Sequence, residues 1–479
     1  MRALFIFLPF LLGFSLLSAQ GIPVDFISNP DRPLVIENRE SGKAVCLFLP
    51  ENFRQNRNYA CKAYECDART LQVLRNGPEL RLPVRGAEDS DLRLLCRTYR
   101  GGDYYFALEN AGACMLYRIA GSDLSLSKAD SFQVEAGTHL IGGVSDGPYA
   151  YVLCSRRIKK QRNELLVYTI APDGRLQEHV VPEPEKQDEV LKDLFKKFFR
   201  ASAVEPDLEY DPESAAAPVK IFAGPDKIRI TFDDAKLGSD NTGTVAAILK
   251  VVTVDLTADS MYVARHRYTD RLIFNPAWEG RSSYILGDRL FQLYFNEEQF
   301  TLRARDLDSG APLFARTLLW PDTISNLLNS PLLIPGQGWF GIEKEYKNMR
   351  DFLQRFARFR PFLQVRRAGD VYLMSLGGYN EKEVSVPIAG VGIVSGLAVG
   401  LAVNISYERT FAFYSAVDAG TLRRSSVYFE KPLFQVYEEM LKAADNPRDS
   451  ALYRIGGVFY LGYFDKKAKQ YEFKKIEGY

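Results

Sequence analysis

The three histidines are the first residues to consider for metal chemistry. They are His139, His179 and His266, and no two of them stand four residues apart or beside a Glu-rich motif. A zinc hydrolase needs two or three converging histidines, so distant parts of this chain would have to bring all three together. We therefore expect no zinc centre in this protein.

Calcium binding and covalent catalysis have equally weak support in the sequence. Three aspartates lie in one polar segment: Asp233, Asp234 and Asp240. Their spacing does not match a calcium-binding EF-hand loop and fits a plain β-turn better. One Gly-x-Ser-x-Gly sequence occurs, at residues 143–147, but it leads into an aromatic-rich strand and not into the helix that follows a nucleophile elbow. We expect no metal and no cofactor, and we favour a non-enzymatic protein.

The most distinctive local composition is a basic and aromatic stretch, residues 344–367, here named the Arg–Phe segment. It carries eight Lys or Arg, two acidic residues and four interleaved Phe. The pattern predicts a helix over 344–359 that continues past Pro361 to residue 367. Arginines beside aromatic rings can bind acidic polysaccharide, anionic lipid or single-stranded nucleic acid. The predicted ligand-binding residues are Arg350, Arg355, Arg358, Arg360, Phe352 and Phe356.

A second interpretation of the Arg–Phe segment is packing. Met349, Phe352, Leu353 and Phe356 fall on one helical face, which would cover the rest of the protein while the arginines point to water. This packing interpretation is favoured. Over the whole chain, 61 basic residues nearly balance 60 acidic ones, so there is no basic surplus to bind nucleic acid.

All six cysteines fall in the first third of the chain. Four of them lie in apolar, strand-like runs, where a thiol serves as a small buried hydrophobe: Cys46, Cys96, Cys114 and Cys154. Cys61 and Cys66 stand in a more polar stretch and are the plausible disulfide pair, although spacing alone does not fix connectivity.

Short alternating runs bounded by Gly, Asp and Asn dominate the rest of the chain and predict half-buried β-strands. Residues 281–317 give three or four antiparallel strands in about 37 residues, the length of one propeller blade. A turn followed by an aromatic-rich strand recurs near residues 102, 146, 226, 287, 338, 369 and 456. The first strands and the last one, residues 470–476, would pair to close a ring.

With its Gly-Asp, Leu-Tyr and Asp-Leu-Asp-Ser-Gly-Ala-Pro-Leu-Phe sequence, the 281–317 unit resembles blades of the quinoprotein or kelch-like type. The resemblance to the β-propeller superfamily implies an all-β ring of roughly seven blades. Phe314 stands where quinoprotein repeats place a tryptophan, so their cofactor binding does not carry over. The alternative fold is a pair of tandem β-sandwich domains.

Two insertions interrupt the strand pattern: the helical and acidic residues 183–217 and the Arg–Phe segment. In the first, a helix is predicted over 187–201. Its apolar face comprises Val190, Leu191, Leu194, Phe195 and Phe198. Residues 205–218 are acidic and rich in Pro and Ala, which predicts a solvated linker.

Residues 1–20 carry the pattern of a signal peptide. Arg2 gives a positive start, residues 4–17 are almost entirely apolar, and Ser18-Ala19 supplies small residues for cleavage after Ala19 or Gln20. The apolar run is too short to be a comfortable membrane anchor, although a retained anchor is the alternative. Residues 21–479 are then expected to form one propeller-like domain.

Residues 387–405 are uncharged, with Gly392, Gly396 and Gly400 at the spacing of membrane helix dimers. A membrane-inserting segment is one interpretation. Two buried strands joined by a glycine-rich turn fit better, because several small residues interrupt the run and a strand follows at 410–417. We expect no transmembrane span.

These observations favour an exported, monomeric binding protein with a protein or glycan as its partner. Its location would be the periplasm, the cell surface or the outside of a bacterial cell. One alternative is a carbohydrate-active hydrolase or lyase with two carboxylates in the central funnel. The other is a structural envelope component that docks through residues 190–198 or through the Arg–Phe segment.

Overall fold

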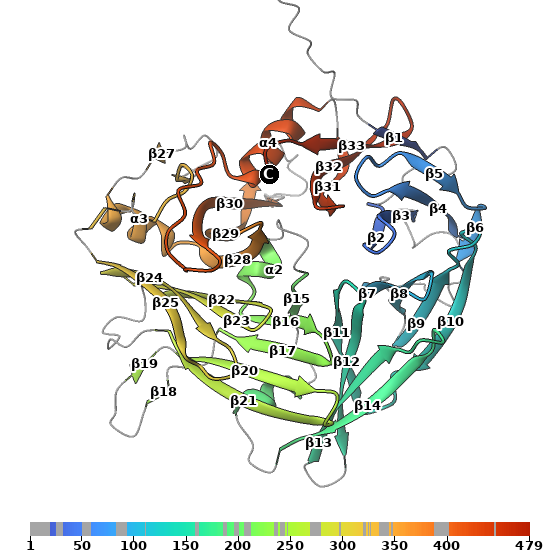
Figure 1. The fold of residues 1–479 in the computed structure, drawn as a ribbon, viewed down its shortest axis with the longest axis horizontal. Coiled ribbons are helices and arrows are strands. Elements are labelled where there is room, and N and C mark those ends of the chain that lie inside the picture. Colours follow the sequence, from blue (N-terminus) through green and yellow to red (C-terminus); the bar gives the residue numbers. More distant parts are fainter. Residues whose placement is uncertain are drawn as a thin grey trace, which may run out of the picture.

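The structure is a computed structural model in which most of the chain is described (Figure 1). The described residues are 20–24, 32–49, 59–82, 93–110, 112–158, 162–184, 189–195, 201–205, 212–233, 238–239, 245–246, 248–268, 279–296, 298–319, 322–323, 325, 327–334, 344–345, 348–387, 402–444 and 447–479. In this part of the chain, seven sheets stand around a central axis, and their strands pair antiparallel except for the parallel β15–β16 pair.

The first three blades follow one another directly along the chain. Blade one holds β2 (Leu34–Asn38), β3 (Lys43–Phe48), β4 (Tyr59–Asp67), β5 (Val73–Asn76) and β6 (Leu80–Leu82). Blade two holds β7 (Arg93–Arg100), β8 (Asp103–Asn110), β9 (Ala113–Ile119) and β10 (Leu126–Gln133). Blade three holds β11 (Thr138–Asp146), β12 (Tyr149–Ile158), β13 (Arg162–Ile170) and β14 (Leu176–Pro182).

The remaining four blades carry the additions to the ring. Blade four holds β15 (Ser202–Ala203), β16 (Val219–Gly224), β17 (Lys227–Phe232), β20 (Ile248–Asp255) and β21 (Ser260–Arg267). Blade five holds β22 (Gly280–Leu286), β23 (Arg289–Phe295), β24 (Gln299–Asp306) and β25 (Pro312–Leu319). Blade six holds β28 (Arg360–Ala368), β29 (Val371–Pro387) and β30 (Ala402–Asp418), and blade seven holds β31 (Arg448–Ile455), β32 (Val458–Asp465), β33 (Gln470–Ile476) and β1 (Gln20–Pro23).

Two small ladders lie outside the blades: β18 (Gly238–Ser239) with β19 (Val245–Ala246), and β26 (Leu333–Ile334) with β27 (Lys344–Glu345). The seven radial sheets confirm the predicted all-β propeller of about seven blades and not the tandem sandwich alternative. Residues on both faces of a central strand are buried, as in β23, because each sheet packs between two neighbours.

The ring is closed by its two ends. β1 pairs antiparallel with β33, with Gln20 opposite Phe473 and Pro23 opposite Gln470. Ile22 and Phe473 are buried in the cluster shared by blades seven and one. Closure of this kind leaves no unpaired gap between the first and last blades, and the predicted pairing of the chain's first strand with residues 470–476 is confirmed.

Two-residue turns set the register within the blades. The β22–β23 hairpin pairs Leu286 with Arg289, so only Gly287 and Asp288 lie in the loop. Gly287 has φ of +58°, a left-handed conformation that glycine adopts without steric cost. The recurrent turns near residues 102, 146, 226, 369 and 456 are likewise two-residue hairpin loops, whereas the turn near 338 lies outside the described residues.

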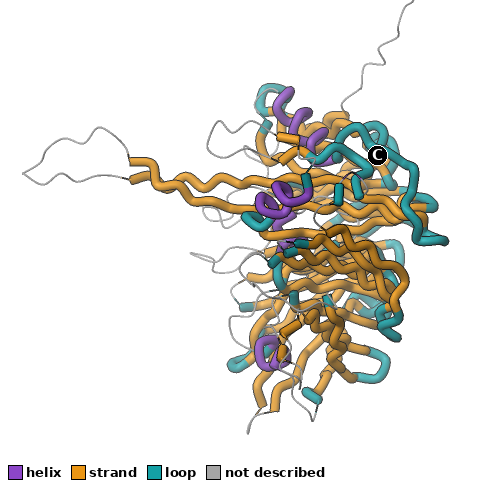
Figure 2. Tube along the Cα trace, turned by 90° about the vertical axis from the view of Figure 1, so that its left-hand side faces the viewer, coloured by secondary structure: helices purple, strands orange, loops and turns teal. Residues whose placement is uncertain are grey.

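Blade six departs from the other six. β29 and β30 are 17 residues each, and their ladder runs from Val371 opposite Asp418 to Pro387 opposite Ala402. Figure 2 shows this two-stranded arm projecting from the body of the ring. Of the two buried strands expected within residues 387–405, only Pro387 and residues 402–405 are described as strand, and the residues between them lie outside the described part of the chain, so that expectation stays a prediction. No described helix is long and apolar enough to cross a membrane.

The predicted helices differ from those in the structure. α1 (Glu189–Leu194) lies within the predicted 187–201, of which 187–188 and 196–200 lie outside the described residues. α2 (Pro212–Ala216) falls in the expected solvated linker, and that expectation is wrong there. Pro212 and Ala215 are buried, and the helix contacts β28 and β29. α4 (Leu433–Ala443) was not expected from the sequence.

The Arg–Phe segment is only partly helical. α3 (Met349–Phe356) begins at the cap Asn348, whose side chain accepts the Arg350 N–H, and it ends before residue 360. The predicted continuation to residue 367 is wrong, because residues 360–368 form β28, the first strand of blade six. Proline disfavours the helical conformation of the residue before it, and here Pro361 follows Arg360.

The six cysteines are buried and free. The proposed Cys61–Cys66 disulfide is wrong, because both residues lie on β4, five positions apart in an extended strand. Five residues span about 16 Å at 3.3 Å each, far beyond the reach of a disulfide. Their thiols also enter different interfaces, Cys61 between blades one and two and Cys66 between blades seven and one.

Candidate functional site

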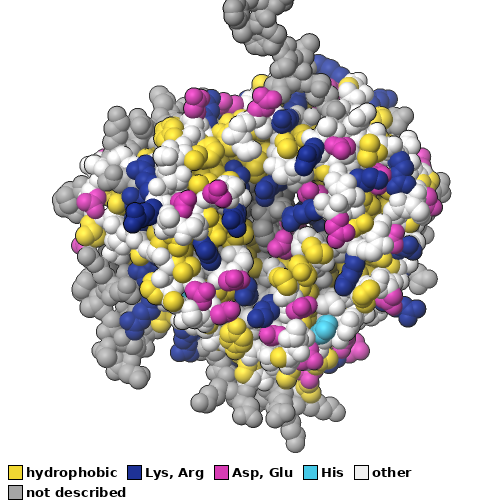
Figure 3. Space-filling model, viewed as in Figure 1, with side chains coloured by type: hydrophobic (Ala, Val, Ile, Leu, Met, Phe, Trp, Pro, Cys, Tyr) yellow, Lys and Arg dark blue, Asp and Glu magenta, His cyan; other side chains and the backbone are white. Residues whose placement is uncertain are grey.

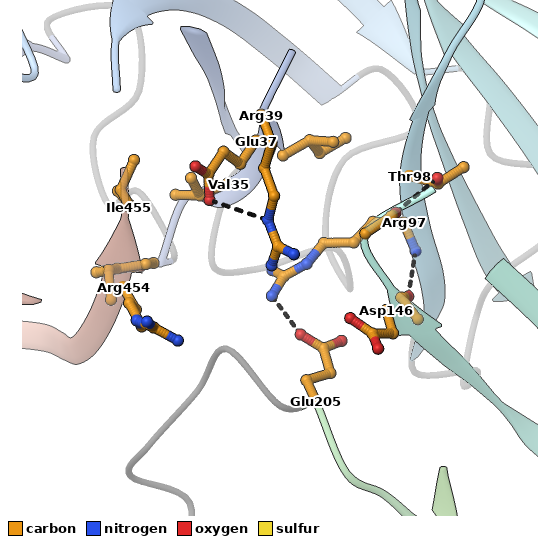
Figure 4. Close-up of a pocket in the computed structure, with 13 residues that line it drawn as sticks. Val35, Glu37, Arg39, Arg97, Thr98, Asp146, Glu205, Arg454 and Ile455 are labelled. Atoms are coloured by element: carbon orange, nitrogen blue, oxygen red, sulfur yellow. Dashed lines mark hydrogen bonds and ion pairs between the residues drawn. The ribbon is translucent and has the colours of Figure 1, made fainter. Parts of the chain in front are cut away.

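A pocket of about 70 Å³, here named the axial pocket, lies where blades one, two, three and seven meet at the centre of the ring. Figure 3 shows the central hollow, with Lys and Arg side chains gathered around it. The charged residues that line the axial pocket are three arginines and three acids: Arg39, Arg97, Arg454, Glu37, Asp146 and Glu205 (Figure 4). None of them was among the residues predicted from the sequence.

Arg97 reaches the pocket from β7, the inner strand of blade two. Its guanidinium donates to Glu205 at 2.5 Å, and both side chains are about one-fifth exposed. Glu205 follows β15, the first strand of blade four, so this ion pair links blade four to blade two. The backbone N–H of Arg97 also donates to the hydroxyl of Ser145 at 2.9 Å, which fixes β7 beside β11.

Arg39 and Glu37 come from the end of β2. The Arg39 guanidinium lies 4.0 Å from Glu37, and half of its side chain is exposed, so this contact holds it loosely. Glu37 also accepts a hydrogen bond from the backbone N–H of Gly456 at 3.1 Å. Glu37 therefore links blade one to blade seven, where Arg454 enters the pocket from β31.

Asp146 differs from the other two acids of the axial pocket. It ends β11, and its carboxylate forms no hydrogen bond or ion pair with another described residue. Burial raises the pKa of Asp146, the charge of Arg39 lowers it and the charge of Glu205 raises it. Figure 4 shows Asp146 facing into the space between Arg97 and Glu205.

The pocket therefore places three guanidinium groups around a space that admits a carboxylate-sized group and a few waters. Guanidinium forks match carboxylate and phosphate oxygens, and they bind them more strongly when partly shielded from water. Glu205 and Arg97 are engaged with each other, and Glu37 accepts a hydrogen bond from Gly456, so two of the three acids already have partners. This arrangement favours recognition of an anionic group over acid–base chemistry by two free carboxylates.

The structure separates the predicted ligand residues of the Arg–Phe segment. Phe352 and Phe356 are fully buried, and Phe356 stacks on Phe295 with ring centroids 4.4 Å apart. Their ring faces are used in packing and do not reach a ligand in solvent. Arg350, Arg358 and Arg360 are exposed and Arg355 is half-buried, and their role in binding stays a prediction.

The docking face expected over residues 190–198 is also occupied. Val190, Leu191 and Leu194 are buried in the cluster between blades three and four. α1 therefore fills a blade interface, and these three side chains are not available to an outside partner. Phe198 lies outside the described residues.

Asp233, one of the three aspartates weighed as calcium ligands in a segment expected to form a plain β-turn, has another use. Asp233 pairs with Lys220 and accepts hydrogen bonds from Tyr268 and Ser283, all buried between blades four and five. Asp234 and Asp240 lie outside the described residues. In the described part of the chain, no group of three or more His, Cys, Asp or Glu is placed to hold a metal ion.

The axial residues were missed because each is ordinary in its own strand. Arg97, Asp146 and Arg454 stand in or at the end of the inner strands of three blades, 49 or more residues apart. One signal was available: Asp146-Gly147 is among the recurrent turns that open an aromatic strand. Turns at blade ends carry binding residues in propellers, but the sequence does not say which turns face the axis.

No family model matches this sequence, and no curated protein matches it. Among solved structures, the chain is similar to the Dos1 propeller, with a TM-score of 0.34 and 10% identity over 95% of this chain and 86% of that chain. A mutant of the Synechocystis apocarotenoid oxygenase matches with a TM-score of 0.30 and 8% identity, over 60% of this chain and 61% of that chain. A Lactobacillus plantarum protein matches with a TM-score of 0.27 and 9% identity, over 71% of this chain and 79% of that chain. These likenesses carry no functional argument, and the chain's own seven sheets define it as a β-propeller.

Proposed function

We propose that this β-propeller is an exported, monomeric, non-enzymatic binding protein. It recognises an anionic group on a partner protein or glycan through the axial pocket. The observation that carries the proposal is the convergence of Arg39, Arg97 and Arg454 from three blades on one pocket. A rigid ring fixes these groups in advance, which lowers the entropy lost on binding.

Export rests on residues 1–20 and their signal-peptide pattern. Cleavage after Ala19 would leave all four residues of β1 to pair with β33, whereas cleavage after Gln20 would remove one pair from the closing ladder. Ring closure and processing are therefore compatible at Ala19. Mass spectrometry of the mature N-terminus tests this, and an intact Met1 on the folded protein would contradict export by signal-peptide cleavage.

The binding proposal is tested by calorimetric titration with two acidic probes, oligogalacturonate and poly-L-glutamate. At least one should bind, with an affinity that falls as salt rises. Replacing Arg39 and Arg454 together by Gln should weaken binding at least tenfold. Arg175→Gln is the matched control, since its side chain is 78% exposed on blade three outside the pocket. Equal binding by both variants, or no binding of either probe, contradicts the proposal.

The exposed arginines of the Arg–Phe segment offer a separate surface for anionic glycan or lipid. Reversing the charge of Arg355, Arg358 and Arg360 tests it, because binding at this surface would be abolished. Binding that survives this triple variant but is lost in the Arg39 and Arg454 variant supports the axial pocket. The opposite result transfers the proposal to α3 and β28.

A hydrolase or lyase is the second candidate, and Asp146 is the observation that favours it. Its pKa is raised by burial, as a general acid requires, and Glu205 lies in the same pocket. A two-carboxylate mechanism would have to free Glu205 from Arg97. Release of reducing ends from acidic polysaccharide, lost in Asp146→Asn, would establish catalysis and overturn the non-enzymatic proposal.

A further inference from the structure

A second cleft borders the axial pocket on its outer side. This side cleft, of about 360 Å³, lies among blades two, three and four. The residues of interest in its wall are Arg100, Pro148, Tyr149, Gln177, Asp226 and Thr257. It combines an aromatic ring, a proline and several polar groups, and no described metal-binding cluster lies in it.

One turn separates the two hollows. Asp146 and Gly147 line the axial pocket, and the next two residues, Pro148 and Tyr149, line the side cleft. The turn is held down from blade two, because the Thr98 hydroxyl donates to the Gly147 carbonyl at 2.9 Å. The same strand, β7, supplies arginines to both hollows, Arg97 to the axial pocket and Arg100 to the side cleft.

Tyr149 is placed as a stacking platform. Its side chain packs against the buried cluster between blades three and four but stays half-exposed in the cleft. It forms no ring contact or side-chain hydrogen bond with another described residue. A ring supported on one side and open on the other can stack against the apolar face of a sugar ring.

Free hydrogen-bonding groups surround that platform. Asp226 and Gln177 are exposed, and neither side chain forms a hydrogen bond or ion pair with another described residue. Arg100, in contrast, is fixed, because its guanidinium donates to the Ile170 carbonyl. Acceptors and donors at fixed positions beside an aromatic ring are what the hydroxyl groups of a carbohydrate require.

We infer that the ligand is an acidic oligosaccharide that spans both hollows. This inference rests on the proposed function of the axial pocket, which would hold the carboxylate of one uronate unit. The neighbouring sugar crosses the turn at residues 146–149 and stacks on Tyr149, with hydroxyl groups bonded to Asp226 and Gln177. A glycan is favoured over an acidic peptide because the exposed polar side chains of Asp226 and Gln177 lie in the same cleft as the half-exposed ring of Tyr149, while the second tyrosine of the cleft, Tyr151, is buried.

The test compares galacturonate monomer with its tetramer in calorimetric titrations at fixed salt. The wild-type protein should bind the tetramer at least tenfold more tightly than the monomer. Tyr149→Ala should remove this gain and leave monomer binding unchanged, whereas Tyr149→Phe should keep most of it. The matched control is Tyr428→Ala, since Tyr428 is 61% exposed and lies outside both hollows. Thermal unfolding confirms that each variant folds.

The possible outcomes distinguish sugar binding in the side cleft from anion binding in the axial pocket. If monomer and tetramer bind equally and Tyr149→Ala has no effect, the side cleft is not a sugar site, although the axial pocket still binds anions. If the Arg39 and Arg454 variant binds normally, the axial proposal fails whatever Tyr149 does. A glutamate tetrapeptide that shows the same length gain and the same Tyr149 dependence would make the cleft a peptide groove and overturn the glycan assignment.

Discussion

Two clusters in this ring each combine acidic and basic side chains, and they differ in how many partners their carboxylates have. In the sealed cluster between blades four and five, Asp233 binds Lys220, the Tyr268 hydroxyl and both the N–H and hydroxyl of Ser283. In the axial pocket, Asp146 has no such partner among the described residues. A carboxylate with all its acceptor sites filled stabilises the fold, whereas an open one can still accept hydrogen bonds from the hydroxyl groups of an incoming ligand.

Burial explains why the sealed cluster must be complete. Lys220 and Asp233 are almost fully buried, and two charges taken out of water are stable only with close partners. Burial and the Asp233 charge raise the pKa of Tyr268 well above its ordinary value, so Tyr268 stays a neutral hydrogen-bond donor. Ser282 and Ser283 belong to β22, so the cluster also joins blade five to blade four.

The largest expected effect comes from breaking the sealed cluster. Asp233→Ala leaves Lys220 charged and buried without its partner, and we expect the free energy of unfolding to fall by about 3–5 kcal/mol. Urea unfolding at pH 7 measures it. Asp173→Ala is the control, because its pair with Arg175 is well exposed and should cost at most about 1 kcal/mol. A loss below about 1 kcal/mol for Asp233→Ala would mean that the cluster is open to water.

A smaller loss is expected from the axial pair. Arg97→Gln removes the partner of Glu205, and both side chains keep about one-fifth exposure. Water can therefore solvate the remaining carboxylate, and we expect a loss of about 1 kcal/mol. The loss should shrink as salt rises, because solvent ions screen a partly exposed pair. The Asp233→Ala loss should change little with salt, and a similar salt dependence for both variants would remove the distinction between the clusters.

The ring itself could be read from the sequence, because its signals are local. Turns such as Gly287-Asp288 between alternating strands repeat at blade-like spacings, and they predicted both the blade count and closure by residues 470–476. In the Arg–Phe segment the favoured packing interpretation is confirmed, because the helix that forms over 349–356 buries Met349, Phe352, Leu353 and Phe356. Its extension failed because residues 360–368 pair with β29, a contact that helical spacing does not reveal.

Neither charge cluster could be predicted, because each joins residues distant in sequence. Lys220 and Ser283 are 63 residues apart, and Arg97 and Glu205 are 108 residues apart. Strand periodicity tells which face a side chain occupies but not which blade lies against that face. Lys220, in an apolar run, was the one visible clue, since a buried lysine requires an acidic partner.

The smallest expected change in the free energy of unfolding comes from replacing Asp146 by Asn, and the same substitution at Asp233 provides the comparison. Because burial raises the pKa of Asp146, the folded protein binds that proton more tightly than the unfolded chain. The wild-type protein therefore loses stability as pH rises from the unfolded pKa of about 3.9 through the raised folded pKa. Asp146→Asn escapes this loss, so it should be slightly more stable than wild type at pH 7. The difference should shrink as pH falls toward 4.

The opposite sign is expected for Asp233→Asn, because an amide cannot replace the charge that Lys220 and Ser283 require. Urea unfolding of both variants at pH 4 and pH 7 provides the four measurements. If Asp146→Asn proves less stable than wild type at pH 7, its carboxylate has a structural partner, and the axial pocket is a second brace. If it is more stable, the chain carries an unfavourable carboxylate beside three arginines, which a purely structural pocket would not require.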